Sequence, residues 1–119
     1  MSGAAGAAAA PLTWDDFLKV DVRVGRIVAA EPFLEARNPA FRLRLDFGEL
    51  GERRSSAQIT KRYRAQELVG RLVVAVVNFP PKRIAGFLSE VLVLGVYAGE
   101  GDVVLLQPDL AVEPGQRVG

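Results

Sequence analysis

Hydrophobic and charged residues alternate without interruption in residues 41–47, which read FRLRLDF. Successive side chains of a β-strand point to opposite faces, so this pattern predicts a strand with one apolar face on a core and one charged face in water. A similar alternation from Val20 to Glu31 predicts a long first strand, bent near Gly25. Residues 54–59 predict a third strand after a turn at 48–51. Its two faces are Arg54, Ser56, Gln58 and Ser55, Ala57, Ile59.

Three further apolar runs predict strands in the second half of the chain, over residues 72–79, 90–97 and 103–106. Two helices are predicted as well. Thr13 and Asp16 have the spacing of a capping box, so we expect a short N-terminal helix after Thr13 that docks by its aromatic side chains. The second half of residues 59–70 is predicted to be helical, with Gly70 as its C-terminal cap.

The order of these elements predicts an all-β fold. Five strands of these lengths, with a short N-terminal helix and a helix between strands three and four, are the plan of a five-stranded OB-fold barrel with a C-terminal extension. An immunoglobulin-like sandwich is the competing architecture, but it would not contain that helix. We expect one domain over residues 13–119, preceded by a disordered Ala/Gly-rich tail over residues 1–12.

The fourth and fifth strands are apolar on both faces, as LVVAVVNF and VLVLGVY show. Only one face of a strand points into a small barrel, so the outer face needs another cover. We predict a homodimer that buries this face. The alternative is that the N-terminal helix and tail cover it within one chain.

The composition of the 119-residue chain narrows the function. It contains no cysteine and no histidine, which removes disulfides, thiolate nucleophiles, histidine bases and most transition-metal sites. The motifs GxSxG, SxxK and the P-loop are also missing from the sequence, so we predict a protein that is not an enzyme and uses no cofactor or metal. No apolar run reaches the length of a membrane span and no targeting segment is recognisable, so we expect a cytoplasmic protein without membrane insertion.

Positive charge is concentrated in the middle of the chain. Residues 37–83 hold eleven bases and four acids, although the whole chain has a net charge of only +1. Arg42 and Arg44 leave the outer face of strand two beside Arg54, Ser56 and Gln58, on strands that form the ligand face of an OB fold, and Lys61, Arg62 and Arg64 follow. Because few acids lie nearby in the sequence, we interpret this face as a binding surface for phosphate groups or an extended polypeptide. The simpler alternative is a charged, solvated sheet face.

The segment between strands four and five reads NFPPKRIAGFLSE, residues 78–90. Pro80 and Pro81 stiffen it and Gly86 permits a turn that other residues resist, so we predict a rigid recognition loop. Such a loop would present Lys82 and Arg83 beside Ile84 and Phe87. A plain hairpin connection with solvated charges is the alternative. The candidate binding residues of the whole surface are Arg42, Arg44, Arg54, Ser56, Gln58, Lys61, Arg62, Asn78, Phe79, Lys82, Arg83, Ile84, Phe87 and Ser89.

The strings SSAQITKRY (55–63), VVNFPPKRIAGFLSEVLVLG (76–95) and GDVVLLQPD (101–109) resemble the CsaA export-related chaperone family, within the tRNA-binding-domain group of OB folds. The resemblance runs from about Trp14 to Gly119. It implies a small cytoplasmic homodimer that binds unfolded or precursor polypeptides and assists export without ATP or metal.

Relatives in that group that bind tRNA typically have Ser-Glu/Gln-Gly-Met where this chain has Ser89-Glu90-Val91-Leu92, and they favour Ser-Gly where it has Ala57-Gln58. Valine in place of glycine blocks close approach of a backbone, and leucine is stiffer than methionine. These departures favour the chaperone branch. Binding of tRNA or structured RNA through the same face is the second hypothesis, and an accessory or purely structural role is the third.

Overall fold

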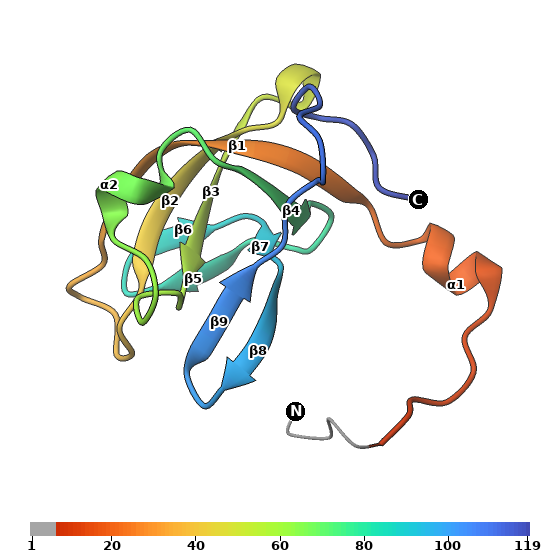
Figure 1. Ribbon diagram of the computed structural model, residues 1–119, viewed down its shortest axis with the longest axis horizontal. Helices are drawn as coiled ribbons and strands as arrows, with labels where there is room; N and C mark the ends of the chain where they lie inside the picture. Colours follow the sequence, from red (N-terminus) through yellow and green to blue (C-terminus); the bar gives the residue numbers. More distant parts are fainter. Residues whose placement is uncertain (1–6) are drawn as a thin grey trace.

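A twisted antiparallel sheet of five strands forms the body of the protein in the computed structural model, which describes residues 7–119 (Figure 1). Its strands are β1 (Val22–Pro32), β2 (Phe41–Asp46), β3 (Glu52–Ala57), β4 (Leu72–Val76) and β7 (Leu92–Val93), in the order β3-β2-β1-β4-β7. Two hairpins complete the β structure: β5 (Lys82–Ile84) with β6 (Phe87–Ser89), and β8 (Gly95–Gly99) with β9 (Asp102–Leu105). The helices are α1 (Trp14–Leu18), a 3-10 turn, η2 (Gly48–Leu50), and α2 (Ala65–Leu68).

The sheet curls until the chain before β7 returns to β3. There the Glu90 N–H donates to the carbonyl of Arg54 at 2.7 Å, and Ser55 Oγ donates to the carbonyl of Val91 at 2.9 Å. The strands therefore form a nearly closed five-stranded barrel, which confirms the predicted OB-fold plan. The sandwich alternative is wrong, and α2 lies between β3 and β4 as expected.

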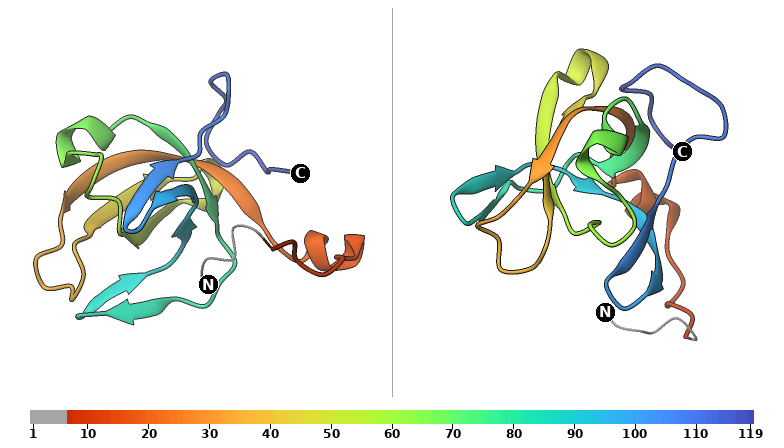
Figure 2. Two further views of the ribbon diagram at one scale, coloured as in Figure 1. Left: turned by 60° about the horizontal axis from the view of Figure 1, so that its bottom comes forward. Right: turned by 60° about the vertical axis from the view of Figure 1, so that its left-hand side comes forward.

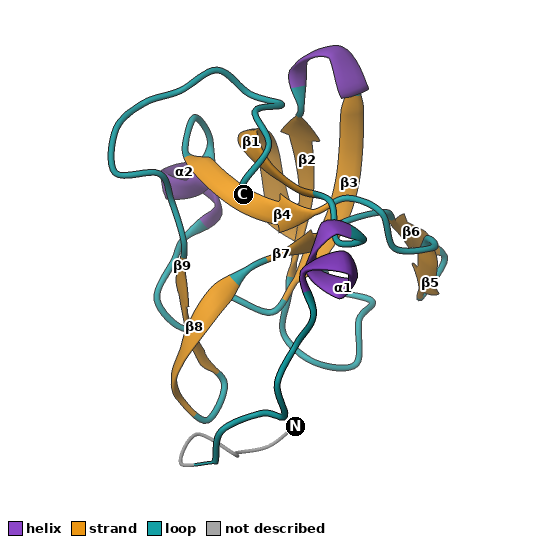
Figure 3. Cartoon of the chain, turned by 90° about the vertical axis from the view of Figure 1, so that its right-hand side faces the viewer, coloured by secondary structure: helices purple, strands orange, loops and turns teal. Residues whose placement is uncertain are grey.

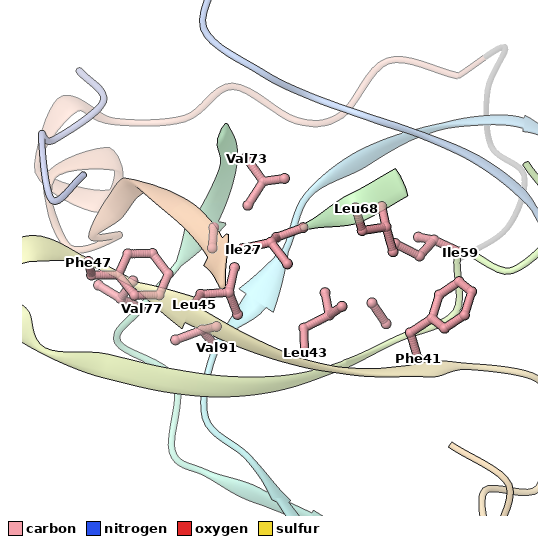
Figure 4. Close-up of a cluster of buried hydrophobic side chains, with 12 residues drawn as sticks. Ile27, Phe41, Leu43, Leu45, Phe47, Ile59, Leu68, Val73, Val77 and Val91 are labelled. Atoms are coloured by element: carbon pink, nitrogen blue, oxygen red, sulfur yellow. The ribbon is translucent and has the colours of Figure 1, made fainter. Parts of the chain in front are cut away.

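The apolar side of the alternating pattern fills the barrel. Leu43, Leu45 and Phe47 are almost completely buried, together with Ile27 of β1 and Leu68 of α2 (Figure 4). The Phe47 ring lies against Gly25, where an added Cβ atom would be only 2.6 Å from Phe47 Cε1. Glycine at this position therefore lets β1 pass close to the core ring, and the next residue, Arg26, is paired with both β4 and β2.

The N-terminal helix forms where predicted, and the Asp16 N–H donates to Thr13 Oγ1 at 3.1 Å. Its docking was predicted wrongly, because none of its residues is buried and Trp14 is 82% exposed. The helix projects from the barrel in Figure 1, and Figure 3 views the chain from the side on which it lies. The predicted tail falls largely outside the described residues, since residues 1–6 are not among them, and residues 7–12 are exposed without regular structure.

The C-terminal segment covers the edge of β1 that no sheet strand occupies. The Val24 N–H donates to the carbonyl of Gln116 at 2.9 Å, and the Val118 N–H donates to that of Val22 at 2.8 Å. Arg117 bonds the carbonyl of Leu18 at 3.1 Å, so the same segment also holds the end of α1. None of the helices in residues 7–119 is long and apolar enough to cross a membrane.

Several predicted boundaries need correction. The predicted loop over residues 80–89 is the β5–β6 hairpin, whose turn residues Ala85 and Gly86 both have positive φ, 46° and 83°. Such φ values are typical of a type I′ turn, and the alanine hid the signal because it rarely adopts them. The fourth strand ends at Val76 instead of Phe79, and the third strand covers 52–57 instead of 54–59.

The predicted fifth strand is two strands. Leu92 and Val93 stay paired with β4, whereas the chain from Gly95 onward pairs with β9 in a separate hairpin. Gly95 belongs at this departure point, since a Cβ atom there would lie 2.5 Å from Val103 Cγ1 and 2.8 Å from the carbonyl oxygen of Val104. The predicted sixth strand forms as β9, shifted by one residue.

Candidate functional site

The β5–β6 hairpin packs against the arginine-bearing face of β2 and β3 through the ring of Phe87. The guanidinium of Arg54 lies 5.5 Å from the centre of this ring and that of Arg42 lies 6.0 Å from it. Phe33 meets Phe87 edge-on, with ring centres 5.3 Å apart, and Arg42 also lies 5.3 Å from the centre of the Phe33 ring. We call Phe33, Arg42, Arg54 and Phe87 the arginine–aromatic cluster.

Hydrogen bonds from the backbone of β3 to the side chains of Ser89 and Glu90 fix this arrangement. Arg54 and Ser56 are outward residues of β3, as their alternation predicts, and their N–H groups point away from β2. The Ser56 N–H donates to Ser89 Oγ at 3.0 Å, and the Arg54 N–H donates to Glu90 Oε1 at 2.9 Å. Ser89, the residue shared with tRNA-binding relatives, thus contacts the protein's own backbone and sits beside the cluster.

The charged groups of the sheet face are paired. Arg42 lies 3.0 Å from Glu31, Arg44 lies 2.9 Å from Glu52, and Arg54 lies 3.6 Å from Glu90. The expectation that few acids lie near these arginines was therefore wrong, because Glu31 and Glu90 come from other segments that the fold brings to the face. These pairs are partly exposed and screened by water, so they orient the arginines more than they stabilise the fold.

The cations without an ion pair in residues 7–119 are found elsewhere. They include Lys82 and Arg83 of β5, which are exposed on the hairpin that carries Phe87, and Lys61, which is exposed near the β8–β9 hairpin. In the hairpin register Arg83 pairs with Leu88, on the face opposite to Ile84 and Phe87. A hollow of about 240 Å³ opens at the cluster, lined by Arg42, Arg44, Arg54 and Phe87. Arg42 Nε is buried there with no hydrogen-bond partner in the described part of the chain.

A larger groove, of about 940 Å³, separates residues 56–61 from residues 92–97. We call it the seam groove, because it lies where β3 and β7 diverge. Gln58 and Lys61 line one wall, and Val93, Gly95 and Tyr97 line the other. The β8–β9 hairpin that carries the second wall projects from the barrel apart from β5–β6 (Figure 2).

Residues 61–63 hold this hairpin in place. Arg62 pairs with Asp102 through two bonds, of which Nη2 to Oδ2 measures 2.9 Å, and the Leu105 N–H donates to the hydroxyl of Tyr63 at 3.0 Å. The hydrogen bond from Arg62 lowers the pKa of the Asp102 carboxyl below its ordinary value. In the same way Arg23 lowers the pKa of Asp21 at the base of α1.

The structure therefore divides the predicted surface in two. The first group lies on the hairpin and the sheet face and comprises Arg42, Arg44, Arg54, Ser56, Lys82, Arg83, Ile84, Phe87 and Ser89. Gln58 and Lys61 line the seam groove, and Arg62 pairs with Asp102 of β9. Phe79 is exposed just after β4. The side chain of Asn78 bonds the Asp21 N–H at 3.0 Å and the Lys19 carbonyl at 2.7 Å, so its amide holds the N-terminal segment.

Sequence reasoning missed several residues of these surfaces. Phe33 was assigned to a loop, yet it is 3% exposed and packs edge-on against Phe87. A bulky aromatic directly after a strand was the signal that could have revealed it. The sequence predicted a single barrel strand that contains Val93, Gly95 and Tyr97. These residues line the groove because that strand is split into β7 and β8. The local pattern of apolar residues does not show the split.

Comparison with known proteins assigns most of the chain to one domain family. The family described as tRNA binding domain matches residues 22–117. The solved structure of the chaperone CsaA from Bacillus anthracis is 57% identical, covers 92% of this chain and 100% of that one, and superposes with a TM-score of 0.89. CsaA from Picrophilus torridus is 49% identical, with the same coverage and a TM-score of 0.86. The resemblance seen in residues 55–63, 76–95 and 101–109 is confirmed by these structures.

Proteins concerned with tRNA match as well. A MetRS-related protein from Pyrococcus horikoshii is 28% identical over 93% of this chain and all of that one, with a TM-score of 0.82. The methionine–tRNA ligase of Thiobacillus denitrificans is 41% identical over 87% of this chain but only 16% of its own length. That of Sorangium cellulosum is 43% identical over 89% of this chain and 15% of its own length. The chain thus spans about a sixth of these ligases.

Proposed function

The chain belongs to the tRNA binding domain family, and we propose that it acts as a chaperone-type binding module, which holds extended segments of unfolded or precursor polypeptides without ATP. The observation that carries this proposal is the match to two CsaA chaperones along their whole length, at 57% and 49% identity. We further propose that it acts in the cytoplasm, on polypeptides destined for export.

The geometry supports binding of a chain that carries apolar and acidic groups. The arginine–aromatic cluster offers the partly exposed ring of Phe87 beside guanidinium groups, and Lys82 and Arg83 add exposed positive charge on the same hairpin. The hairpin is fastened to β3 by the bonds of Ser56 and Arg54, so these groups keep their spacing before a ligand arrives. A surface fixed in advance loses less conformational entropy on binding.

The charge of the hairpin provides the test. Replacing both cations, Lys82→Glu with Arg83→Glu, should weaken capture of an unfolded client at least several-fold, because attraction of acidic segments becomes repulsion. Thermal stability should barely change, since both side chains are exposed. The control is Arg37→Glu with Arg64→Glu, which makes the same change in net charge at two exposed cations outside the hairpin. Equal capture by wild type and the hairpin variant, in the absence of ATP, would remove the hairpin from the site.

We also propose a homodimer that buries exposed apolar side chains. Trp14 and Leu18 of α1, with Leu92, Val96 and Tyr97 of the β7–β8 region, are exposed on the single chain. Few soluble monomers leave so many large apolar side chains in water. These exposed apolar side chains lie on α1 and in the β7–β8 region. The residues of β4, in contrast, are all buried or partly buried. Sedimentation equilibrium should give twice the chain mass, and a monomer at micromolar concentration would contradict the dimer.

Binding of tRNA or structured RNA is the second candidate, favoured by the family match and by the ligase relatives. Its mark is an affinity that falls steeply and log-linearly with salt, since each phosphate contact releases a counterion. Peptide binding through aromatic and backbone contacts should depend on salt much less. Tight tRNA binding that survives physiological salt, without any peptide binding, would reverse the order of the two candidates.

A further inference from the structure

The hollow of about 240 Å³ at the arginine–aromatic cluster lies on the outer face of the sheet. Ala29 of β1 is opposite Arg44 of β2 in the strand register, and both line the hollow together with Phe87 of the hairpin. The register of β1 with β2 shifts between Ile27 and Ala29, so a β-bulge lies beside the hollow. Bulges bend a strand and often border binding sites. The hollow therefore results from strand geometry and from the short side chain of Ala29.

Three arginines crowd this face of β2 and β3. Arg44 and Arg54 are directly opposite each other in the register, and Arg42 is two residues along β2 on the same face. Like charges on opposed residues destabilise a sheet. Each arginine has one glutamate beside it, namely Glu31, Glu52 and Glu90. The face thus concentrates guanidinium groups without accumulating a large net charge.

Two of these guanidinium groups keep unused hydrogen-bond donors. The ion pair of Arg42 with Glu31 engages Nη2, at 3.0 Å, while the Arg42 Nε is buried without a partner in residues 7–119. Glu90 Oε1 lies 3.6 Å from Arg54 Nε, beyond hydrogen-bond distance, and accepts from the Arg54 backbone N–H at 2.9 Å instead. A buried donor without a partner is costly, so these groups favour the entry of an acceptor.

Aromatic rings fix both guanidinium groups beside the hollow. Arg42 lies 5.3 Å from the centre of the Phe33 ring and 6.0 Å from that of Phe87, and Arg54 lies 5.5 Å from the latter. The faces of the rings attract these cations. Phe33 is buried, so it is a firm support, whereas Phe87 keeps part of its ring exposed. The donors are therefore in position before a ligand binds, which lowers the entropy lost on binding.

The chemistry of the hollow favours one carboxylate over a polyanion. A planar guanidinium matches a carboxylate and forms strong charge-assisted hydrogen bonds with it. The three glutamates balance the three arginines, so the face lacks the strong positive field that attracts RNA from a distance. Successive phosphates would also lie close to Glu31 and Glu90. A single carboxylate on an apolar stem reaches the donors, and its stem packs on the exposed part of Phe87.

We propose that this hollow is a subsite for one carboxylate group of a bound polypeptide, which accepts hydrogen bonds from Arg42 Nε and from the guanidinium of Arg54. The inference rests on the proposed chaperone function and names the client group that the surface reads. The apolar side chains that the proposed homodimer buries do not line the hollow, so both copies keep it available. Lys82 and Arg83, on the same hairpin, supply the longer-range attraction that the balanced face lacks.

The test compares peptides on the full chain. The parent is a labelled nine-residue peptide of alanine, leucine and serine with one central glutamate and an amidated C-terminus, and its partner has glutamine in place of the glutamate. We expect the glutamate peptide to bind roughly tenfold more tightly at physiological salt, because the amide of glutamine cannot form the charge-assisted bonds. Fluorescence anisotropy measures both affinities.

A third peptide distinguishes the two sources of a carboxylate. It carries the central glutamine but has a free C-terminus. An affinity equal to that of the glutamate peptide would support a site that reads the end of a client chain. An affinity equal to that of the amidated glutamine peptide would support a site that reads acidic side chains.

Protein variants test the two donors. Arg42→Gln and Arg54→Gln should each reduce the preference for the glutamate peptide to about twofold or less, because each removes one partner of the carboxylate. Arg37→Gln removes the same charge from an exposed residue that does not line the hollow, and should keep the preference. Thermal unfolding shows whether each variant keeps its fold, and the peptide pair on the wild-type chain decides the question without any variant.

The outcomes separate this inference from the proposed function. If neither the peptides nor a permanently unfolded protein binds, the proposed function itself fails. If the unfolded protein binds but the glutamate and glutamine peptides bind equally, the carboxylate site is wrong although the chaperone function stands. If the preference survives Arg42→Gln and Arg54→Gln but is lost in the Lys82→Glu, Arg83→Glu variant, the exposed cations read the carboxylate. Displacement of the glutamate peptide by tRNA at physiological salt would make the hollow a phosphate site and overturn the inference.

Discussion

The two ends of the β3–β7 seam are built from neighbouring residues of the same strands, but only one end is sealed. Four hydrogen bonds join residues 54–56 to residues 89–91 at the closed end. A few residues further on, the walls separate around a groove of about 940 Å³. The buried core lies in the barrel, so the fold draws most of its stability there.

The largest difference in the free energy of unfolding is expected between a substitution in the core and one in the β8–β9 hairpin, at the open end of the seam. Leu45→Ala removes a side chain that is fully buried, and should lower the free energy of unfolding by about 2–5 kcal/mol. Val96→Ala removes one that is 52% exposed, and should cost less than about 0.5 kcal/mol. Urea denaturation at low protein concentration measures both. Similar losses would mean that the hairpin is part of the cooperative core.

A smaller difference in the free energy of unfolding is expected between substitutions at the two ends of the seam. Ser55→Ala removes the buried bond from Ser55 Oγ to the Val91 carbonyl and leaves that carbonyl unpaired, at a cost of about 1–3 kcal/mol. Gln58→Ala, an exposed change on the groove wall, should leave the free energy of unfolding within about 0.5 kcal/mol. A loss for Gln58→Ala as large as that for Ser55→Ala would show that the open end is sealed in solution.

The ion pair at the hairpin should affect local opening more than global stability. Arg62→Gln breaks the pair with Asp102, which is half-exposed on the arginine side, so the free energy of unfolding should fall only slightly. Amide exchange in β8 and β9 should nevertheless accelerate, because their attachment to residues 61–63 is loosened. Arg44→Gln, which breaks the exposed pair with Glu52, serves as the control and should leave exchange in this hairpin unchanged.

Lowering the pH should produce the smallest change in the free energy of unfolding. The pKa values of Asp102 and Asp21 are lowered by their arginine partners, so each pair stabilises the folded state fully above about pH 4, the pKa of an unfolded aspartate. This contribution declines as the pH falls through the lower pKa of the folded state. Unfolding followed between pH 6 and pH 2 should show the decline, and it should be smaller in Asp102→Asn. An unchanged acid profile in that variant would assign the decline to other groups.

The sequence predicted the barrel because its signals are local. Strict alternation in residues 41–47 placed Leu43, Leu45 and Phe47 in the core, and Thr13 marked the start of α1. The turn at Ala85 could not be predicted, since its positive φ depends on the pairing of Ile84 with Phe87. The partner acids Glu31 and Glu90 were equally hidden, because they reach the arginines only through long-range folding.

The candidate site was predicted as one surface, and the fold makes it two. Phe87 of the hairpin does meet the sheet face at Arg42 and Arg54. Lys61 and Arg62 follow β3 in the sequence, but the chain turns them toward β8–β9. The residue at which a strand ends determines which surface the following residues join. Strand ends depend on the neighbouring strands with which the chain pairs, and the alternation of apolar and polar residues does not reveal these neighbours.

Hydrogen exchange at the backbone of β5 and β6 tests the central claim most directly, namely that the surface around this hairpin holds an extended polypeptide. These amides should become better protected when an unfolded client is added, while amides at the closed end of the seam, such as Ser56, stay protected throughout. Capture of the client with no change at the hairpin amides would contradict the account.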